Sequence, residues 1–314
     1  MKLLLLEHID EAAVRKVVPD IEIVRSDRDG VVDAVRDANV LIGSPGNKWR
    51  EILQTAKRLR WVHVSSAGVD PMMCPEFLAS DVVLTCAKGD VVGPLLAEHA
   101  FALMLALTRG IALCVRDGRW NRHDGQAGKA VYEVGGKTMG LVGFGGVGRY
   151  LAGMAQAFNM NVIAVRRSPG DGPEGVTIWG PDRFYDLLAQ SDVVVVSVPD
   201  TPDTREMFNA EAFRKMKKTA ILITVGRGKT VDTDALVDAL QHGEIGGAGL
   251  DVVDPEPLPD DHPLWQFRNV IITPHIAGNA PERAGRNHTL VLENLRHLAN
   301  GEPLESVVDK QAGY

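Results

Sequence analysis

Cysteine is scarce in this sequence, and its spacing fits neither a disulfide framework nor a zinc site. The 314 residues include three cysteines, Cys74, Cys86 and Cys114, an odd number without C-x-x-C spacing. A reducing compartment is the simpler interpretation. No two of the nine histidines have H-x-x-x-H spacing, so we expect no bound metal.

Long apolar runs are also lacking. The opening run of residues 1–6 ends at Glu7 and His8, which is too early for a signal peptide. A membrane span needs about 18 apolar residues, and the best candidate, residues 95–107, is interrupted by Glu98 and His99. We therefore expect a cytoplasmic protein without membrane contacts.

A surplus of basic residues is missing as well. The net charge is −7 and the pI about 5.7, which argues against a broad nucleic-acid-binding surface. What the chain does have is 45% hydrophobic residues and 32 glycines. That composition predicts a globular protein of one or two domains, with many tight turns or backbone that a ligand approaches closely.

Short apolar runs alternate with helix-period segments along most of the chain. This order indicates βαβ units with parallel sheets, whose strands are covered on both faces. Residues 94–107 are apolar on nearly all sides and predict a helix buried between layers or domains. The expected strands are residues 3–6, 21–24, 40–42, 61–64, 82–85, 138–142, 161–165, 192–198, 220–224, 248–252 and 270–272. Helices are expected over residues 29–38, 50–57 and 281–300, and from near residues 147, 182, 209 and 233.

Residues 140–148 contain the pattern G-x-G-x-x-G directly after an expected strand and before a helix. The pattern is typical of dinucleotide binding, since the glycines permit a tight turn, approach of a pyrophosphate and close helix packing. The helix N-terminus would attract the phosphates. The residues expected to contact the cofactor here are Gly143, Gly145, Gly146, Val147 and Gly148.

The next expected strand runs into Arg166-Arg167-Ser168, and no acidic residue occurs between Gly148 and Asp171. An NAD site usually has a carboxylate here for the ribose 2′-hydroxyl. Guanidinium groups bind a 2′-phosphate instead. The sequence therefore favours NADP(H), with NAD(H) possible; two solvated arginines at a strand end are the alternative interpretation.

Three further segments contain expected strands and carry polar residues at or just after the carboxyl ends of these strands, where ligands bind in open α/β sheets. They carry Arg227, Asp251 with Glu256, and His275. Taken singly, each has an ordinary alternative: a paired loop arginine, a turn former, a solvated carboxylate and a hydrogen-bonded structural histidine.

Together with these motifs, the sequence resembles the D-isomer-specific 2-hydroxyacid dehydrogenase family over nearly its whole length. The matching segments, in order, are S-A-G-V-D at 66–70, A-E-H at 97–99, the glycine loop, P-D-T-P-D-T at 199–204, R-G at 227–228, 250–257 and T-P-H-I-A-G at 273–278. Arg166, Arg167 and P-L-W at 263–265 resemble the glyoxylate/hydroxypyruvate reductase branch. The family often has Asn and Ala before R-G, where this chain has Thr224, Val225 and Gly226.

The resemblance implies a fold of two Rossmann-like/flavodoxin-like parallel-sheet domains with an active-site cleft between them. Residues 1–93 plus 282–314 would form the substrate-binding domain, and residues 94–281 the dinucleotide-binding domain. It also implies a homodimer through the nucleotide domain, with residues 116–120 in a dimer arm. Glu98 and His99 are expected to serve in interdomain packing or hydrogen bonding.

The roles that the chemistry suggests agree with those of the family. Arg227 would clamp the substrate carboxylate in two-point geometry. His275 would exchange the proton, because imidazole titrates near neutrality, and Glu256 would orient its ring. By resemblance, Asp251 would contact the nicotinamide, Pro199 and Thr204 would line the cofactor site, and Ala67, Gly68 and Val69 would offer backbone N–H groups to the substrate.

These expectations define an NADP(H)-dependent reductase of small 2-keto acids, glyoxylate or hydroxypyruvate first, producing D-2-hydroxy acids. An NAD-linked D-2-hydroxyacid or phosphoglycerate dehydrogenase is the first alternative. The second is a dinucleotide-sensing, corepressor-like interaction protein on the same fold. The expected partners are small 2-keto or 2-hydroxy acids and a second copy of the chain.

Overall fold

The chain folds into two compact units. The computed structural model describes residues 1–118, 120 and 131–314. The first unit comprises Met1–Val92 and Ala280–Tyr314, and the second comprises Gly93–Asn279, so the chain passes between them twice. Of the expected dimer arm, residues 116–120, Arg119 lies outside the described residues.

The first unit is built on a five-stranded parallel sheet with strand order β2-β1-β3-β4-β5. This is the flavodoxin-like order. Its strands are β1 (Lys2–Leu5), β2 (Glu22–Arg25), β3 (Val40–Ile42), β4 (Trp61–Val64) and β5 (Val83–Cys86). Its helices are α1 (Glu11–Val17), α2 (Val31–Ala34), α3 (Trp49–Thr55), α4 (Pro75–Leu78) and α12 (Pro281–Asn300), with 3-10 turns at Gly46–Lys48 and Asp70–Met72.

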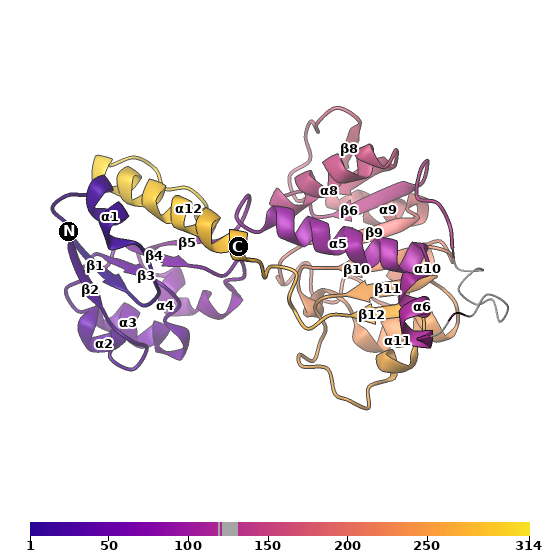
Figure 1. The fold of residues 1–314 in the computed structure, drawn as a ribbon, viewed down its shortest axis with the longest axis horizontal. Coiled ribbons are helices and arrows are strands. Elements are labelled where there is room, and N and C mark those ends of the chain that lie inside the picture. The colour runs from indigo at the N-terminus through magenta and orange to yellow at the C-terminus, as the bar shows by residue number, and fades with distance from the viewer. Residues whose placement is uncertain (119, 121–130) are drawn as a thin grey trace. The chain divides into compact units, whose positions relative to one another are not determined.

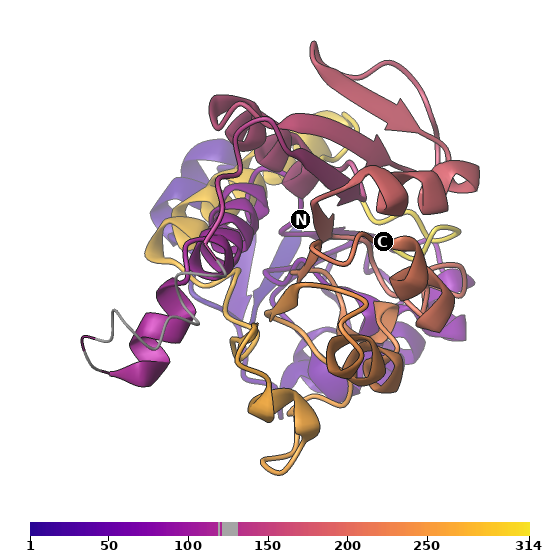
Figure 2. The same cartoon turned by 90° about the vertical axis from the view of Figure 1, so that its right-hand side faces the viewer.

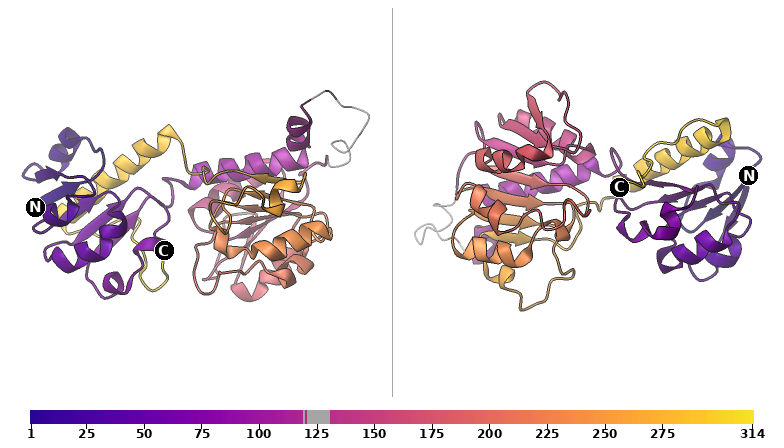
Figure 3. Two further views of the ribbon diagram at one scale, coloured as in Figure 1. Left: turned by 90° about the horizontal axis from the view of Figure 1, so that it is seen from below. Right: turned by 180° about the vertical axis from the view of Figure 1, so that it is seen from behind.

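Alternate residues of these strands bury against opposite faces of the sheet. Leu4 and Leu41 pack with α2, α3 and α4, whereas Leu3 and Leu5 pack with α1 and α12. The C-terminal helix α12, yellow in the views, therefore lies beside α1 (Figures 1 and 3). Because helices cover both faces of this sheet, strands such as β1, β3 and β4 are nearly continuous apolar runs in the sequence.

The second unit is built on a seven-stranded parallel sheet with order β12-β11-β10-β9-β6-β7-β8. The strands are β6 (Thr138–Val142), β7 (Asn161–Val165), β8 (Val176–Trp179), β9 (Val193–Val196), β10 (Ile221–Thr224), β11 (Gly247–Leu250) and β12 (Val270–Ile272). The chain order reverses between β6 and β9, which is the switch point where doubly wound folds bind ligands.

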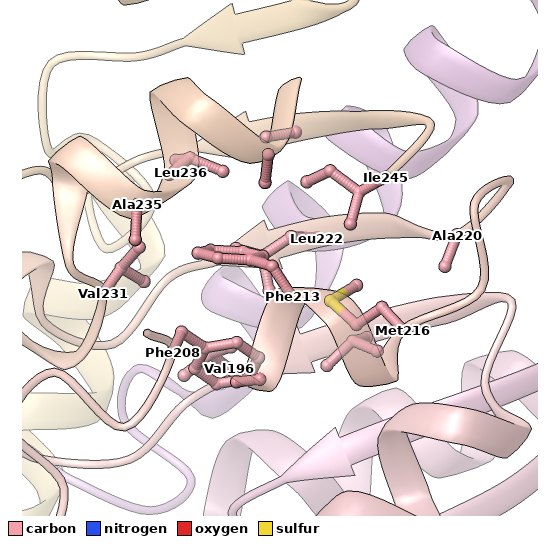
Figure 4. Close-up of a cluster of buried hydrophobic side chains, with 14 of the residues drawn as sticks. Val196, Phe208, Phe213, Met216, Ala220, Leu222, Val231, Ala235, Leu236 and Ile245 are labelled. Carbon is pink, nitrogen blue, oxygen red and sulfur yellow. The ribbon is translucent and has the colours of Figure 1, made fainter. Parts of the chain in front are cut away.

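Helices cover both faces of this sheet as well. One face packs on α5 (Gly93–Thr108) and α8 (Gly146–Ala157), and the other on α9 (Phe184–Gln190), α10 (Ala210–Lys215) and α11 (Thr233–Gln241). Figure 4 shows the second layer, where Phe208 and Phe213 pack with Leu222 of β10 and Leu236 of α11. The other elements that the structure describes in this unit are α6 (Ile111–Asp117) and the 3-10 turns Pro181–Arg183, Gly228–Thr230 and Pro263–Gln266.

Two parallel-sheet α/β domains, the predicted fold class, are confirmed, and all eleven expected strands form with ends that shift by at most two residues. Asp192, Ser197 and Val198, expected in a strand, lie outside β9. Edge strand β8 was not predicted (Figure 2). It is short and partly exposed, and it follows a segment rich in glycine and proline. Helix α2 is shorter than the segment 29–38 suggested.

Among the described residues, no single helix is long and apolar enough to cross a membrane; the bent pair α5 and α6 passes that test only together, at 70°. Helix α5 is largely buried against the sheet of its own unit. Arg116 of α6 donates hydrogen bonds to the carbonyl oxygens of Phe267 and Val270, at 2.7 and 2.8 Å, which holds α6 to the first residue of β12 and to the segment before it.

Candidate active site

The glycine loop lies at the switch point of the second unit, between the ends of β6 and β9. Gly143 has φ +103°, and a β-carbon there would also meet Ser197 at 3.0 Å. Gly148 lies so close to the loop that its β-carbon would be 2.6 Å from the carbonyl oxygen of Gly143. Both positions therefore require glycine, one for backbone conformation and one for close helix packing.

The N-terminus of α8 fits a phosphate group. A β-carbon at Gly145 would meet nothing within 4 Å, so the space beside the helix start is open. In the described part of the chain, no side chain caps α8 at Gly145. Gly146, Val147 and Gly148 form the first turn, whose N–H groups have no partner within a helix. The donor set matches the pyrophosphate of a dinucleotide.

Arg166, Arg167 and Ser168 follow β7, next to β6 in the sheet, as expected. Arg167 and Ser168 are exposed. The Nε of Arg166 is buried and has no hydrogen-bond partner among the described residues. Its guanidinium lies beside Gly170, where a β-carbon would be 2.9 Å from Nη2. A buried guanidinium N–H calls for an anionic or polar acceptor, which a 2′-phosphate would supply.

The segment 199–204 forms a closed loop after β9. The hydroxyl of Thr204 donates to the carbonyl oxygen of Pro199 at 2.6 Å and accepts from the backbone N–H of Thr201 at 2.9 Å. The structure thus brings Pro199 and Thr204 together at the same edge of the sheet as the glycine loop.

Arg227 follows β10 in a loop that two glycines fix. A β-carbon at Gly226 would lie 2.7 Å from the carbonyl oxygen of Val198, and one at Gly228 would lie 1.9 Å from that of Val253. The half-buried guanidinium donates through Nη1 to the carbonyl oxygen of Gly226 at 2.7 Å. The loop therefore holds the arginine by tight backbone packing on both sides.

His275 and Glu256 form a hydrogen-bonded pair. His275 Nδ1 is 2.7 Å from Glu256 Oε1, and the two side chains are 50% and 43% exposed. Because a carboxylate only accepts, Nδ1 is the donor, and Nε2 is the nitrogen left to meet a substrate. His275 has a left-handed backbone, with φ +53°. Strands β10, β11 and β12 are parallel neighbours, so Arg227, Glu256 and His275 belong to one edge of the sheet.

Asp251 is buried and already has partners within the chain. Its Oδ1 accepts from the Thr273 hydroxyl at 2.7 Å and the Ile276 N–H at 3.0 Å, and its Oδ2 accepts from the Ala277 N–H at 2.9 Å. Consecutive backbone N–H groups thus surround the carboxylate in a nest-like turn. The structure shows Asp251 shaping the turn that carries His275, which agrees with the turn former that the sequence left open as its alternative role.

His99 and Thr273 were also missed as parts of this site. His99 Nε2 lies 2.9 Å from Thr273 Oγ1 and 3.4 Å from Asp251 Oδ1, all within the second unit. The only signal in the sequence was the presence of both residues in the family motifs.

The segment with Ala67, Gly68 and Val69 belongs to the first unit, directly after β4. The Ser66 hydroxyl donates to the carbonyl oxygen of Gly68 at 2.8 Å, and Val69 is buried. Preceding Ser65 anchors this segment: its hydroxyl donates to Glu7 and accepts from Asn287 of α12 at 3.0 Å.

Comparisons with known proteins agree with this geometry. Residues 101–277 match the family model described as D-isomer specific 2-hydroxyacid dehydrogenase, NAD binding domain. The chain is 37% identical to glyoxylate reductase of Thermococcus kodakarensis over 295 residues, covering 90% of this chain and 87% of that one. It is 31% identical to D-3-phosphoglycerate dehydrogenase of Methanocaldococcus jannaschii over 308 residues, covering 96% of this chain and 58% of that one.

A solved structure shares the fold over the full length. NADPH-dependent glyoxylate/hydroxypyruvate reductase of Sinorhizobium meliloti, in complex with NADP and sulfate, has a TM-score of 0.83 and 25% identity, covering 100% of this chain and 99% of that one. The chain belongs to the D-isomer specific 2-hydroxyacid dehydrogenase family. It is an NAD(P)-dependent 2-hydroxyacid dehydrogenase with an NAD-binding domain in its second unit.

Proposed function

We propose that this enzyme reduces small 2-keto acids of the glyoxylate or hydroxypyruvate type to D-2-hydroxy acids with NADPH. The observation that carries the proposal is the hydrogen-bonded pair His275–Glu256. The pair lies with Arg227 at one edge of the second unit's sheet, and the glycine loop lies at the switch point of the same sheet. An acid/base group, a carboxylate-binding group and a dinucleotide cradle are what this reaction requires.

Each of the three residues has a separate task. When bound, the reduced nicotinamide supplies the hydride that C2 of the keto acid receives. Arg227 binds the substrate carboxylate through two N–H groups and fixes the orientation of the carbonyl. His275 donates the proton from Nε2 to the carbonyl oxygen, and Glu256 holds the ring by its Nδ1.

The preference for NADPH rests on Arg166 and Arg167. The Nε of Arg166, which is buried and has no partner among the described residues, and the absence of a carboxylate between Gly148 and Asp171 both fit a 2′-phosphate. The neighbour from Sinorhizobium meliloti, in complex with NADP, supports the same choice. NAD-linked oxidation of phosphoglycerate, the first alternative from the sequence, is the second candidate, and the name of the relative from Methanocaldococcus jannaschii, D-3-phosphoglycerate dehydrogenase, supports its substrate.

Assignments beyond these residues are further parts of the proposal. We assign Gly143, Gly145, Gly146, Val147, Gly148, Ser168, Pro199 and Thr204 to the cofactor, and Ala67, Gly68 and Val69 to the substrate. The contact of Asp251 with the nicotinamide, homodimer formation and a cytoplasmic location stay predictions from the sequence.

The test is an initial-rate panel that pairs NADPH or NADH with glyoxylate, hydroxypyruvate, phosphohydroxypyruvate, pyruvate and bulkier 2-keto acids. We expect the highest kcat/KM for NADPH with glyoxylate or hydroxypyruvate, and a chiral column should identify the hydroxypyruvate product as D-glycerate. His275→Ala should lose most turnover and still bind NADPH, because it removes the proton donor and no dinucleotide contact. Preference for NADH with phosphohydroxypyruvate would favour the second candidate instead.

A further inference from the structure

The polar side chain of His99 on helix α5 reaches the turn that carries His275. His99 Nε2 lies 2.9 Å from Thr273 Oγ1, and the Thr273 hydroxyl lies 2.7 Å from Asp251 Oδ1. Since the carboxylate only accepts, the hydroxyl donates to it and must accept from His99. The direction is therefore fixed: His99 N–H to Thr273 O–H to Asp251.

The packing of α5 on the sheet explains why His99 reaches this point. A β-carbon at Gly249 of β11 would lie 3.0 Å from Cβ of Leu103, so the glycine lets α5 approach the strand closely. His99 precedes Leu103 by one helical turn and lies on the same face. With Leu103 over Gly249, His99 lies over the carboxyl end of the strand, where Asp251 follows.

What this chain of hydrogen bonds holds is the backbone of the catalytic turn. The Asp251 carboxylate accepts from the N–H groups of Ile276 and Ala277, and the N–H of His275 donates to the Asp251 carbonyl oxygen at 2.9 Å. The left-handed backbone at His275 is costly for a residue with a side chain, so the surroundings must stabilise it. The nest around Asp251 supplies that stabilisation.

We propose that His99 is a positioning residue for the hydride-transfer reaction, acting through Thr273 and Asp251 on the backbone of His275. The proposal rests on the proposed function only for the role of His275 itself. His99 has no assigned contact with substrate; its donated hydrogen bond fixes the Thr273 hydroxyl, and the hydroxyl fixes one oxygen of the carboxylate that the turn surrounds.

Amide hydrogen exchange of residues 273–279, measured by mass spectrometry on the protein without ligands, tests the proposal first. His99→Leu should speed exchange of this segment about tenfold, because losing one hydrogen bond costs about 1.4 kcal/mol. His99→Gln should stay near the wild type, since its terminal amide can donate to Thr273. His242→Leu, the same change at an exposed histidine of the second unit, is the matched control and should leave the segment unchanged.

A double-mutant cycle with Thr273→Val tests the route of the effect. If His99 acts through the Thr273 hydroxyl, His99→Leu should add nothing to Thr273→Val, either in exchange or in kcat. We expect kcat to fall about tenfold in His99→Leu and in Thr273→Val, with KM for NADPH unchanged in both. Additive effects, unchanged exchange in His99→Leu, or an equal defect in His99→Gln would overturn the proposal. If exchange responds as expected while no 2-keto acid is reduced by the wild type, the proposed function fails and the control of the turn by His99 stands.

Discussion

Gly228 packs directly on the carbonyl oxygen of Val253, so close that a β-carbon on Gly228 would lie 1.9 Å from it. The contact joins two loops of the site, since Gly228 follows Arg227 and Val253 precedes the segment that carries Glu256. The neighbouring atom belongs to the backbone, so it cannot turn aside as the end of a side chain can.

Gly228→Ala should therefore destabilise the second unit by about 2–4 kcal/mol and reduce activity, because one of the two loops must move. Thermal unfolding followed by circular dichroism measures the first effect. Gly153→Ala is the matched control: Gly153 is exposed within α8, nothing lies within 4 Å of its added β-carbon, and helix propensity favours alanine. Equal unfolding temperatures for Gly228→Ala and the wild type would contradict the packing argument.

Arg227→Lys should lower kcat/KM for a 2-keto acid by about ten- to a hundredfold, despite keeping the charge. Lysine offers a point charge where the planar guanidinium binds both oxygens of a carboxylate, and a charged hydrogen bond contributes about 1.5–3 kcal/mol. Initial-rate kinetics give the loss. Arg36→Lys, at an exposed arginine of the first unit paired only with Asp33 in the described contacts, should leave the kinetics unchanged. Wild-type kinetics in Arg227→Lys would remove the clamp from the proposed mechanism.

Replacing Arg166 by Asp and Arg167 by Ala should shift the preference from NADPH toward NADH by about 1.5–3 kcal/mol, the range for lost charged hydrogen bonds. The aspartate would repel a 2′-phosphate and could accept from a ribose 2′-hydroxyl instead. The ratio of kcat/KM for the two cofactors measures the shift. Arg214→Ala on α10, at a solvent-exposed arginine of the same unit, serves as control. An unchanged ratio of kcat/KM for NADPH and NADH would show that Arg166 and Arg167 do not determine the cofactor preference.

The parts of this site that could be predicted are those that neighbouring residues in the sequence indicate. Arg227, Glu256 and His275 each follow an apolar run that forms a strand, buried in β10 and β11 and partly buried in β12, so the strand ends placed them at one edge of the sheet. Gly143 and Gly148 belong to a pattern whose strand–loop–helix context is equally local. Strand β8 was missed because V-T-I-W is short and partly exposed, which weakens any periodic signal.

Contacts between distant segments gave no such signal. His99 and Thr273 are 174 positions apart, and Gly228 meets Val253 by its backbone, so neither contact follows from residue type or spacing. The nest around Asp251 depends on the left-handed backbone at His275, which a histidine in the sequence does not indicate.

The first unit contains a buried histidine that makes its stability depend on pH. His63 is fully buried on β4, and burial, opposed by the hydrogen bond with Asn287, lowers its pKa from 6.5 to about 4. Its Nδ1 is 2.8 Å from Thr85 Oγ1, and its Nε2 is 2.9 Å from Asn287 Oδ1. Asn287 Nδ2 donates in turn to Ser65, next to the segment that we assign to the substrate.

The sign follows from the lowered pKa of His63. Between pH 6.5 and about 4 the unfolded chain binds a proton at this position and the folded chain does not, so stability is complete above pH 6.5 and falls as the pH decreases through this window. The loss from this histidine reaches about 3 kcal/mol near pH 4, at about 1.4 kcal/mol per pH unit. The free energy of unfolding in urea should be measured from pH 7 to pH 4.5. As the pH decreases, it should fall less steeply in His63→Gln than in the wild type, and the difference in slope should correspond to about one bound proton. His8→Gln, at an exposed histidine of the same unit, should keep the wild-type slope. Coinciding slopes for His63→Gln and the wild type would show that His63 does not supply this pH dependence.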